Sequence, residues 1–261
     1  MTLRPALELS DRSRIVVAGD WHGDARWARD VLEAAAAARV DLVIQVGDFG
    51  IGGFGMSGPS MVRQVDKACH KFGCRVVVVP GNHDDYDHLA RRPFDEAGMI
   101  HLGRYIRAVP RPFRFEVGRR RFGALGGAVS VDREDRVEGV DWWPQEAPAW
   151  SDVQSLGTGP LDVLIGHDLP AEVRVTPGGY DIDAATLARA AEVRAMLSTA
   201  ITQTRPQVVF GGHWHERLSH HYMLEDGTAV RCEALDMERT PGNAVVLDLI
   251  SLSVSPLELH P

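Results

Sequence analysis

Short apolar runs alternate with amphipathic or alanine-rich segments along most of the chain. The apolar runs predict buried strands over residues 14–18, 41–46, 75–79, 161–166 and 207–210. The segments between them predict helices over residues 24–39, 59–72 and 183–203. Asp181 or Asp183 is the expected N-cap of the last of these helices. Strands that alternate with helices in this way are typical of an α/β domain.

The other strand patterns indicate antiparallel pairing, so the expected architecture is mixed. Residues 104–128 contain several shorter strand patterns. Asp226-Gly227 has the composition of a tight turn, and it predicts a hairpin between the flanking segments 219–225 and 228–235. Two further strands are expected over residues 243–249 and 252–254.

A short polar block beside glycine follows each of the five predicted buried strands over residues 14–18, 41–46, 75–79, 161–166 and 207–210. The blocks are Asp20-Trp-His22, Gly47-Asp48, Gly81-Asn-His-Asp84, Gly166-His167 and Gly212-His-Trp-His215. Carboxylate, imidazole and carboxamide groups carried on strand ends can bind divalent metals at one edge of a sheet, and glycine allows close approach there. The seven donors Asp20, His22, Asp48, Asn82, His167, His213 and His215 are enough for two adjacent metal sites.

Length and composition limit the class of protein. No linker interrupts the 261 residues, so we expect a single domain over residues 1–261. The three cysteines have no metal-finger spacing, and their odd number argues against a disulfide framework. Without a signal-peptide pattern or a run that approaches membrane-spanning length, we expect a cytoplasmic protein that binds no membrane. The formal net charge of −8 makes polynucleotide binding an unfavoured function.

The ordered blocks resemble those of the calcineurin-like metallophosphoesterase superfamily, and the resemblance covers residues 15 to 215. It implies two packed mixed β-sheets flanked by helices, a four-layer sandwich with a dinuclear metal site at the strand ends. It further implies that one metal is held by Asp20, His22 and His215, and the other by Asn82, His167 and His213. Asp48 would bridge the two metals. By the same resemblance His83 is a catalytic residue at the leaving-group oxygen, and Asp84 would orient its ring.

Two metals that share a carboxylate can clamp a phosphoryl oxygen and make a bridging hydroxide available as the nucleophile. Nitrogen and oxygen ligands without thiolate suit Mn²⁺ first, with Fe, Zn, Ni or Co as alternatives. The chain lacks the arginine and second aspartate that extend the Asp block in serine/threonine protein phosphatases. It has Ile51 where purple acid phosphatases have a metal-binding tyrosine, so no visible charge-transfer band is expected. His83, which is missing in scaffold members of the superfamily, is present.

Substrate contacts are sought in the loop over residues 127–150, which is rich in aromatic and charged groups. Arg133 or Arg136 is the candidate for contacting phosphate, and Trp142 or Trp143 the candidate for a flat apolar face. An equally supported alternative is that both tryptophans pin the loop to the core. Trp21 and Trp214 either wall the cleft or pack under its loops. Residues 50–59 are a candidate for another rim.

The expected function is hydrolysis of a small nucleotide-like or other organic phosphodiester, because the sequence shows no arginine clamp for a monoester dianion. A phosphomonoesterase that acts on a small nucleotide or sugar phosphate is the alternative. A metal-binding scaffold without turnover is the third hypothesis.

Overall fold

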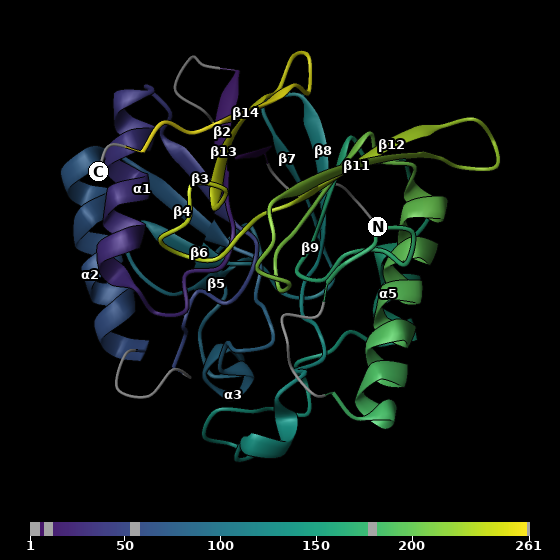
Figure 1. Ribbon diagram of the computed structural model, residues 1–261. Coiled ribbons are helices and arrows are strands. Elements are labelled where there is room, and N and C mark those ends of the chain that lie inside the picture. The colour runs from purple at the N-terminus through teal and green to yellow at the C-terminus, as the bar shows by residue number, and fades with distance from the viewer. Residues whose placement is uncertain (1–5, 8–12, 53–57, 177–181, 260–261) are drawn as a thin grey trace.

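The computed structural model describes residues 6–7, 13–52, 58–176 and 182–259, and two seven-stranded sheets are found among them. The sheets pack face to face, and helices cover their outer faces (Figure 1). The sequence of layers is therefore helix, sheet, sheet, helix, which confirms the expected α/β sandwich.

The first sheet has the strand order β14-β13-β2-β3-β4-β6-β5. Its parallel strands are β2 (Arg14–Ala18), β3 (Leu42–Gln45), β4 (Arg75–Val78) and β6 (Ile106–Ala108). Its antiparallel strands are β5 (Ile100–His101), β13 (Ala244–Asp248) and β14 (Val254–Pro256). The carboxyl ends of the parallel strands therefore meet at one edge of this sheet.

The second sheet has the order β1-β7-β8-β9-β10-β12-β11. Its central strands β8 (Arg120–Leu125), β9 (Val163–Gly166), β10 (Val208–Gly211) and β12 (Ala229–Ala234) are parallel. The outer strands are β1 (Ala6–Leu7), β7 (Phe113–Val117) and β11 (Leu218–Met223), of which β7 and β11 run antiparallel to their inner neighbours. The predicted hairpin is thus β11 and β12, and its second strand continues the parallel set.

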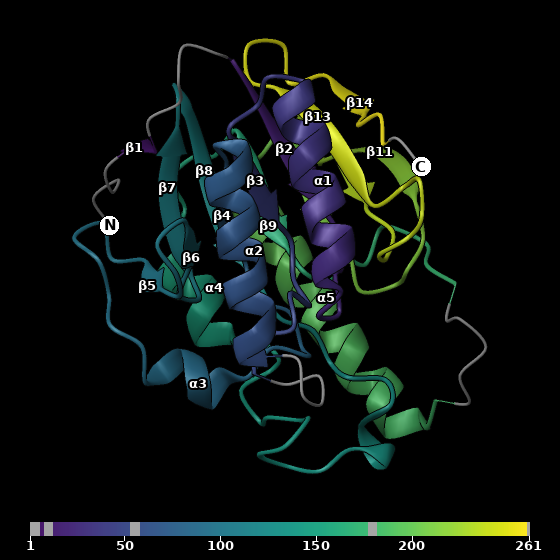
Figure 2. The ribbon, with the colours of Figure 1, turned by 90° about the vertical axis from the view of Figure 1, so that its left-hand side faces the viewer.

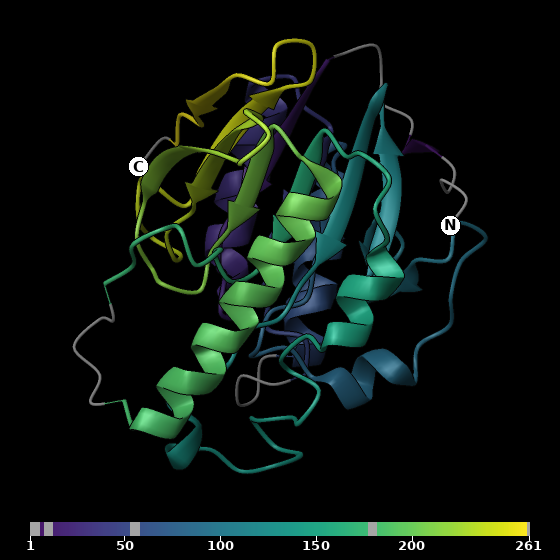
Figure 3. The same ribbon diagram turned by 90° about the vertical axis from the view of Figure 1, so that its right-hand side faces the viewer.

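Alternate residues of each strand explain the layers. In β2, Val16 and Ala18 pack in the core beneath the helices, whereas Ile15 and Val17 pack in the core between the sheets. The helices on this side are α1 (Ala25–Ala37) and α2 (Gly58–Phe72), which cover the outer face of the first sheet (Figure 2). In the second sheet, Leu164 of β9 faces the other pair of helices. These helices are α4 (Trp150–Leu156) and α5 (Ala184–Thr204), which cover that outer face (Figure 3).

The helix ends follow ordinary capping rules. The Asp183 carboxylate accepts from the backbone N–H groups of Ala185 and Thr186, so Asp183 is the N-cap of α5. The alternative cap, Asp181, lies outside the described residues. The short helix α3 (Tyr86–Ala90) and a 3₁₀ turn (Arg133–Asp135) complete the described elements.

The three cysteines are buried and form no disulfide. Within the described ranges, the helices are too short or too polar to cross a membrane.

Candidate metal centre

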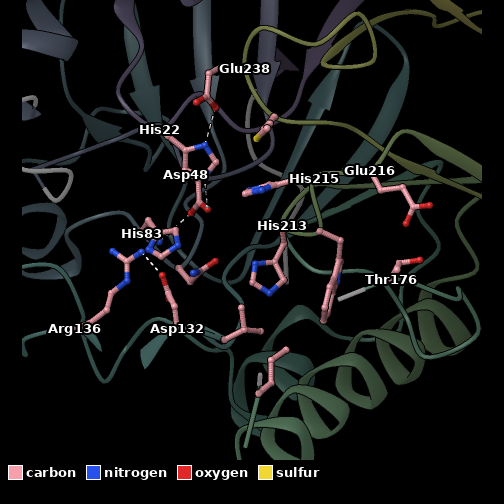
Figure 4. Close-up of a pocket in the computed structure, with 15 residues that line it drawn as sticks. His22, Asp48, His83, Asp132, Arg136, Thr176, His213, His215, Glu216 and Glu238 are labelled. Atoms are coloured by element: carbon pink, nitrogen blue, oxygen red, sulfur yellow. Dashed lines mark hydrogen bonds and ion pairs between the residues drawn. The ribbon is translucent and has the colours of Figure 1, made fainter. Parts of the chain in front are cut away.

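The two sheets bring their strand ends to a common edge. Asp20 and His22 follow β2, Asp48 follows β3, and Asn82 follows β4; His167 follows β9, and His213 and His215 follow β10. Several of these side chains point toward one another in the close-up (Figure 4). The structure thus gathers all seven predicted donors from the ends of five strands.

Two groups of donors lie close enough for metal coordination. In Asp20, His22 and His215, one ligand atom from each residue lies within 4.8 Å of the others, and the same holds for Asp20, Asp48 and His167. The Asp48 carboxylate lies between the groups, because its Oδ2 is 3.5 Å from Nε2 of His22 and 3.2 Å from Nε2 of His167. Asp48 therefore stands where a carboxylate shared by two metals is expected.

The second group also contains Asn82, whose Oδ1 lies 2.9 Å from Nε2 of His167. Nδ1 of His167 lies 3.0 Å from the carbonyl oxygen of Val46, which can only accept, so Nδ1 carries the proton. In the neutral ring Nε2 then presents a lone pair to two further acceptors, Asn82 Oδ1 and Asp48 Oδ2. Three converging lone pairs repel one another unless a cation or a proton lies among them.

Two buried atoms of the seven donors have no hydrogen-bond partner among the described residues. These are Oδ1 of Asp20 and Nε2 of His213. The other Asp20 oxygen accepts from the His213 backbone N–H at 2.9 Å and lies 3.4 Å from Nε2 of His215. Buried polar groups without a partner are rare and costly. A pair of divalent metals would satisfy both atoms, so the oxygen and nitrogen donors fit such ions.

The backbone is strained at four donors. His22, Asp48, His213 and His215 have φ values of 39°, 55°, 68° and 52°, a region that residues other than glycine adopt at a cost of ~1–3 kcal/mol each. Gly81 and Gly212 allow the carboxylates to approach, because a Cβ atom there would lie 2.2 Å from Asp48 Oδ1 and 2.1 Å from Asp20 Oδ1. The strained, positive-φ backbone is therefore concentrated where the donors converge.

The donors shift one another's pKa values. Burial alone would raise the pKa of Asp48, but the charges of His167 and His83 hold it well below the usual value. Burial lowers the pKa of His167, whereas the charge and hydrogen bond of Asp48 raise it to about 9. Burial also opposes charge on His22, yet hydrogen bonds to Asp48 and Glu238 raise its pKa to about 11. The carboxylates therefore favour positive charge at this point.

Glu238 was missed by the sequence reasoning. Its Oε2 lies 2.7 Å from Nδ1 of His22, which leaves Nε2 of that ring directed toward Asp48. Glu238 follows β12, and its position could have been inferred only if the parallel pairing of β12 with β10 had been predicted. The turn at Asp226-Gly227 indicated the hairpin and carried no information on this pairing.

His83 lies at the metal site without belonging to either donor group. Its backbone N–H donates to Asp48 Oδ1 at 2.9 Å, and its half-buried ring lines the pocket beside Arg136 and Asp132 (Figure 4). Burial, Arg136 and His22 lower the pKa of His83, although the Asp48 charge opposes them.

The Asp84 side chain binds backbone groups of two neighbouring loops. Its two buried carboxylate oxygens accept from the backbone N–H groups of Phe49, Gly50, Ile51 and Gly81 at 2.8–3.3 Å. Burial and the neighbouring Asp48 charge raise its pKa to about 6. The observed bonds of Asp84 join the loops after β3 and β4, and orientation of the His83 ring stays a prediction.

We expect Asp84→Asn to destabilise the protein by about 1–3 kcal/mol, because an amide NH₂ facing backbone donors leaves buried groups without partners. Urea unfolding would measure the loss. Asp85→Asn is the matched control, since Asp85 caps α3 by accepting from the His88 N–H and asparagine is an equally good cap. Equal stability of the Asp84→Asn variant and wild type would contradict the joining role.

Five of the seven donors line an open pocket of about 730 Å³, namely His22, Asp48, Asn82, His213 and His215. Of the predicted substrate contacts, Arg136 lines this pocket, where it pairs with Asp132. Arg133 is exposed and stacks on Trp142 at 4.3 Å from the ring centroid. Trp142 and Trp143 are only 6% and 2% exposed, so the structure buries them away from the pocket lining.

The tryptophans beside the donors divide between the two interpretations. Trp21 is buried and packs on Phe49, with ring centroids 5.5 Å apart, whereas Trp214 lines the pocket. Trp214 is held by its indole N–H, which donates to the buried carboxylate of Asp168 at 2.8 Å. In the candidate rim over residues 50–59, residues 53–57 lie outside the described residues.

Metal binding should stabilise the fold measurably. Mn²⁺ at about a hundred times its Kd stabilises a native state that alone binds it by ~2.7 kcal/mol, or roughly 5–10 °C in Tm at this chain length. A thermal melt of chelator-treated protein with and without Mn²⁺ would detect the shift. Mg²⁺ at the same concentration serves as the comparison and should have less effect, because imidazole ligands suit it poorly. An unchanged Tm with Mn²⁺ at every concentration would contradict the candidate site.

The sequence profile described as calcineurin-like phosphoesterase matches residues 13–217. No match is found in a comparison with curated proteins. Among solved structures, the protein TT1561 of Thermus thermophilus is 13% identical, with a TM-score of 0.57, over 99% of this chain and 100% of that one. A dimetal phosphatase from Danio rerio is 15% identical, with a TM-score of 0.53, over 90% of this chain and 92% of that one. At these identities the likeness concerns the fold.

Proposed function

We propose that this chain, which belongs to the calcineurin-like phosphoesterase family, hydrolyses small nucleotide-like or other organic phosphodiesters. The family consists of hydrolases with a dinuclear metal centre, so a metallophosphoesterase reaction is the premise. The observation that carries the proposal is the convergence of seven donors at one edge of the sheets, where five of them line an open pocket.

The proposed assignment of ligands is the one that the family resemblance implies, and the closeness of the donors supports it. Asp20, His22 and His215 would hold one metal, Asn82, His167 and His213 would hold the other, and Asp48 would contact both. When bound, such a pair supplies positive charge to a phosphoryl oxygen and a hydroxide near neutral pH. Mn²⁺ is the proposed ion, with Fe, Zn, Ni or Co as alternatives.

The charge of the pocket supports a diester. Among the described residues that line it, Arg136 is the one Lys or Arg, and it is already paired with Asp132. Three carboxylates outside the proposed metal ligands, those of Asp132, Glu216 and Glu238, share the same lining. A phosphomonoester dianion would meet more repulsion there than a diester that carries one negative charge.

The pocket walls suggest how a substrate would lie. Trp214, Ile182 and Met237 form an apolar part of the lining that can receive the organic group of an ester. His83 stands at the opposite side of Asp48 from His215, where its ring could donate a proton to the leaving oxygen. Arg136, when its guanidinium turns from Asp132, is the proposed phosphate contact.

The test is a comparison of bis-p-nitrophenyl phosphate with p-nitrophenyl phosphate, using protein loaded with Mn²⁺. We expect kcat/KM to be higher for the diester. A preference for the monoester would support the alternative, a phosphomonoesterase for a small nucleotide or sugar phosphate. Absence of cleavage with Mn²⁺, Fe²⁺, Co²⁺, Ni²⁺ and Zn²⁺ would support the metal-binding scaffold.

Two further expectations accompany this proposal. We propose that residues 1–261 form one domain, because the two sheets share one core of interleaved side chains. We also propose a cytoplasmic location, which the three free cysteines support.

A further inference from the structure

A buried pair, Ser130 and Glu146, lies behind the second donor group and has no part in the reaction described above. Both residues belong to the loop between β8 and α4, and both are 0% exposed. The Glu146 carboxylate accepts from the backbone N–H of Ser130 at 3.1 Å and from its hydroxyl. The Ser130 hydroxyl oxygen in turn accepts from Nδ2 of Asn82 at 3.0 Å.

The direction of these bonds follows from the chemistry of Glu146. A carboxylate only accepts, so the single hydroxyl proton of Ser130 is directed to Glu146. The Ser130 oxygen can then only accept from Asn82, which requires the NH₂ end of the amide to face Ser130. The carbonyl end of Asn82 is consequently left to face His167 Nε2.

The far end of the chain of bonds is also anchored. The backbone carbonyl of Glu146 accepts from Nη1 of Arg111 at 3.1 Å and from the hydroxyl of Tyr86 at 3.3 Å. Arg111 also donates to the carbonyl groups of Gln145 and Ala147. Four hydrogen bonds therefore fix the backbone around Glu146, which carries the carboxylate.

We propose that Glu146 and Ser130 are positioning residues that set the orientation of the Asn82 amide and so present its oxygen to the second metal. The inference rests on the metal pair of the proposed function. Without this chain of bonds the amide could rotate by half a turn and present its NH₂ group, which cannot bind a metal.

The test measures metal affinity and does not depend on turnover. Chelator-treated protein would be titrated with Mn²⁺ by calorimetry, and His22→Ala would identify which dissociation constant belongs to the first site. We expect Ser130→Ala to weaken the second site ~10–100-fold, the usual effect of losing a partner of a ligand, and to leave the first within ~twofold. Glu146→Gln, which is nearly isosteric, should weaken the same site. The amide NH₂ of glutamine can donate to the Ser130 oxygen, so the Ser130 hydroxyl is no longer committed to residue 146 and can donate to the carbonyl end of Asn82.

A symmetrical ligand provides the matched control. In an Asn82→Asp background both ligand atoms are oxygen, so half a turn changes nothing. There Ser130→Ala should change the Mn²⁺ affinity of the second site by less than ~threefold, whereas a packing role predicts an equal loss in both backgrounds.

Several results would overturn the inference. Wild-type affinity at the second site in both Ser130→Ala and Glu146→Gln would do so, and so would equal weakening of the two metals or an equal loss in the Asn82→Asp background. Wild-type protein that binds fewer than two Mn²⁺ ions would overturn the proposed function as well. Wild type that binds two, with unaffected variants, would overturn the positioning role alone.

Discussion

Asp48→Asn should weaken both metals at once and lower kcat/KM by ~10³-fold or more, since each metal supplies several kcal/mol to phosphoryl transfer. The Asp48 carboxylate lies near donors of both groups, at 3.5 Å from Nε2 of His22 and 3.2 Å from Nε2 of His167. An amide in its place has one oxygen and no charge, so it cannot serve two cations equally. Elemental analysis after dialysis and steady-state kinetics would measure the two effects.

Asp162→Asn is the matched control for this change. Asp162 is also a buried aspartate, but its carboxylate binds Arg120 and Arg121 and lies outside the pocket lining. We expect this variant to lose stability and to keep both metals at wild-type affinity. Two tightly held metals in the Asp48→Asn variant would show that Asp48 does not bridge them.

His83→Ala should leave the metal content near that of wild type while it slows turnover by ~10²–10⁴-fold, the usual range for a general acid. The ring lies beside Asp48 but belongs to neither donor group, so its removal subtracts a proton donor and no ligand. The deficit should be smaller for a p-nitrophenyl ester than for an alkyl ester, because a good leaving group needs less protonation.

The comparison of leaving groups distinguishes the loss of a proton donor from a general loss of activity. His70→Ala is a further control, since His70 is exposed on α2 and does not line the pocket. If the His83→Ala variant lost its metals, His83 would be a ligand or a support for one. An equal deficit with every leaving group would argue against proton donation.

The strands and their donors were predictable because the information is local. The run at residues 14–18 is β2 to the residue, and the donors that follow it lie in the next four positions. An apolar strand followed by glycine and a polar side chain can be recognised without knowledge of the rest of the fold. The order of such blocks along the chain then indicated the family.

The contacts behind the donors were not predictable, because they depend on which loops meet. Glu238 reaches His22 across 216 residues of sequence, and Ser130 reaches Asn82 across 48. Neither residue has a local pattern that marks it. Asp84 lies next to His83 in sequence, yet its carboxylate points to the backbone of the neighbouring loop.

The burial of the aromatic residues in the 127–150 loop likewise depends on tertiary packing that has no local sequence signal. Trp142 and Trp143 stand in a polar, irregular segment, and the sequence supported contact with substrate and packing on the core equally. The structure buries both, and Arg133 covers Trp142 from the solvent side. The short helices α3 and α4 have 5 and 7 residues, too few for an amphipathic period to be recognised.

The central claim is that seven donors from five strand ends bind two cations next to one another. Anomalous diffraction from crystals grown with Mn²⁺ tests it most directly. We expect two peaks ~3.5–4 Å apart on either side of Asp48, one beside His22 and the other beside His167. A single peak, or two peaks without Asp48 between them, would contradict it.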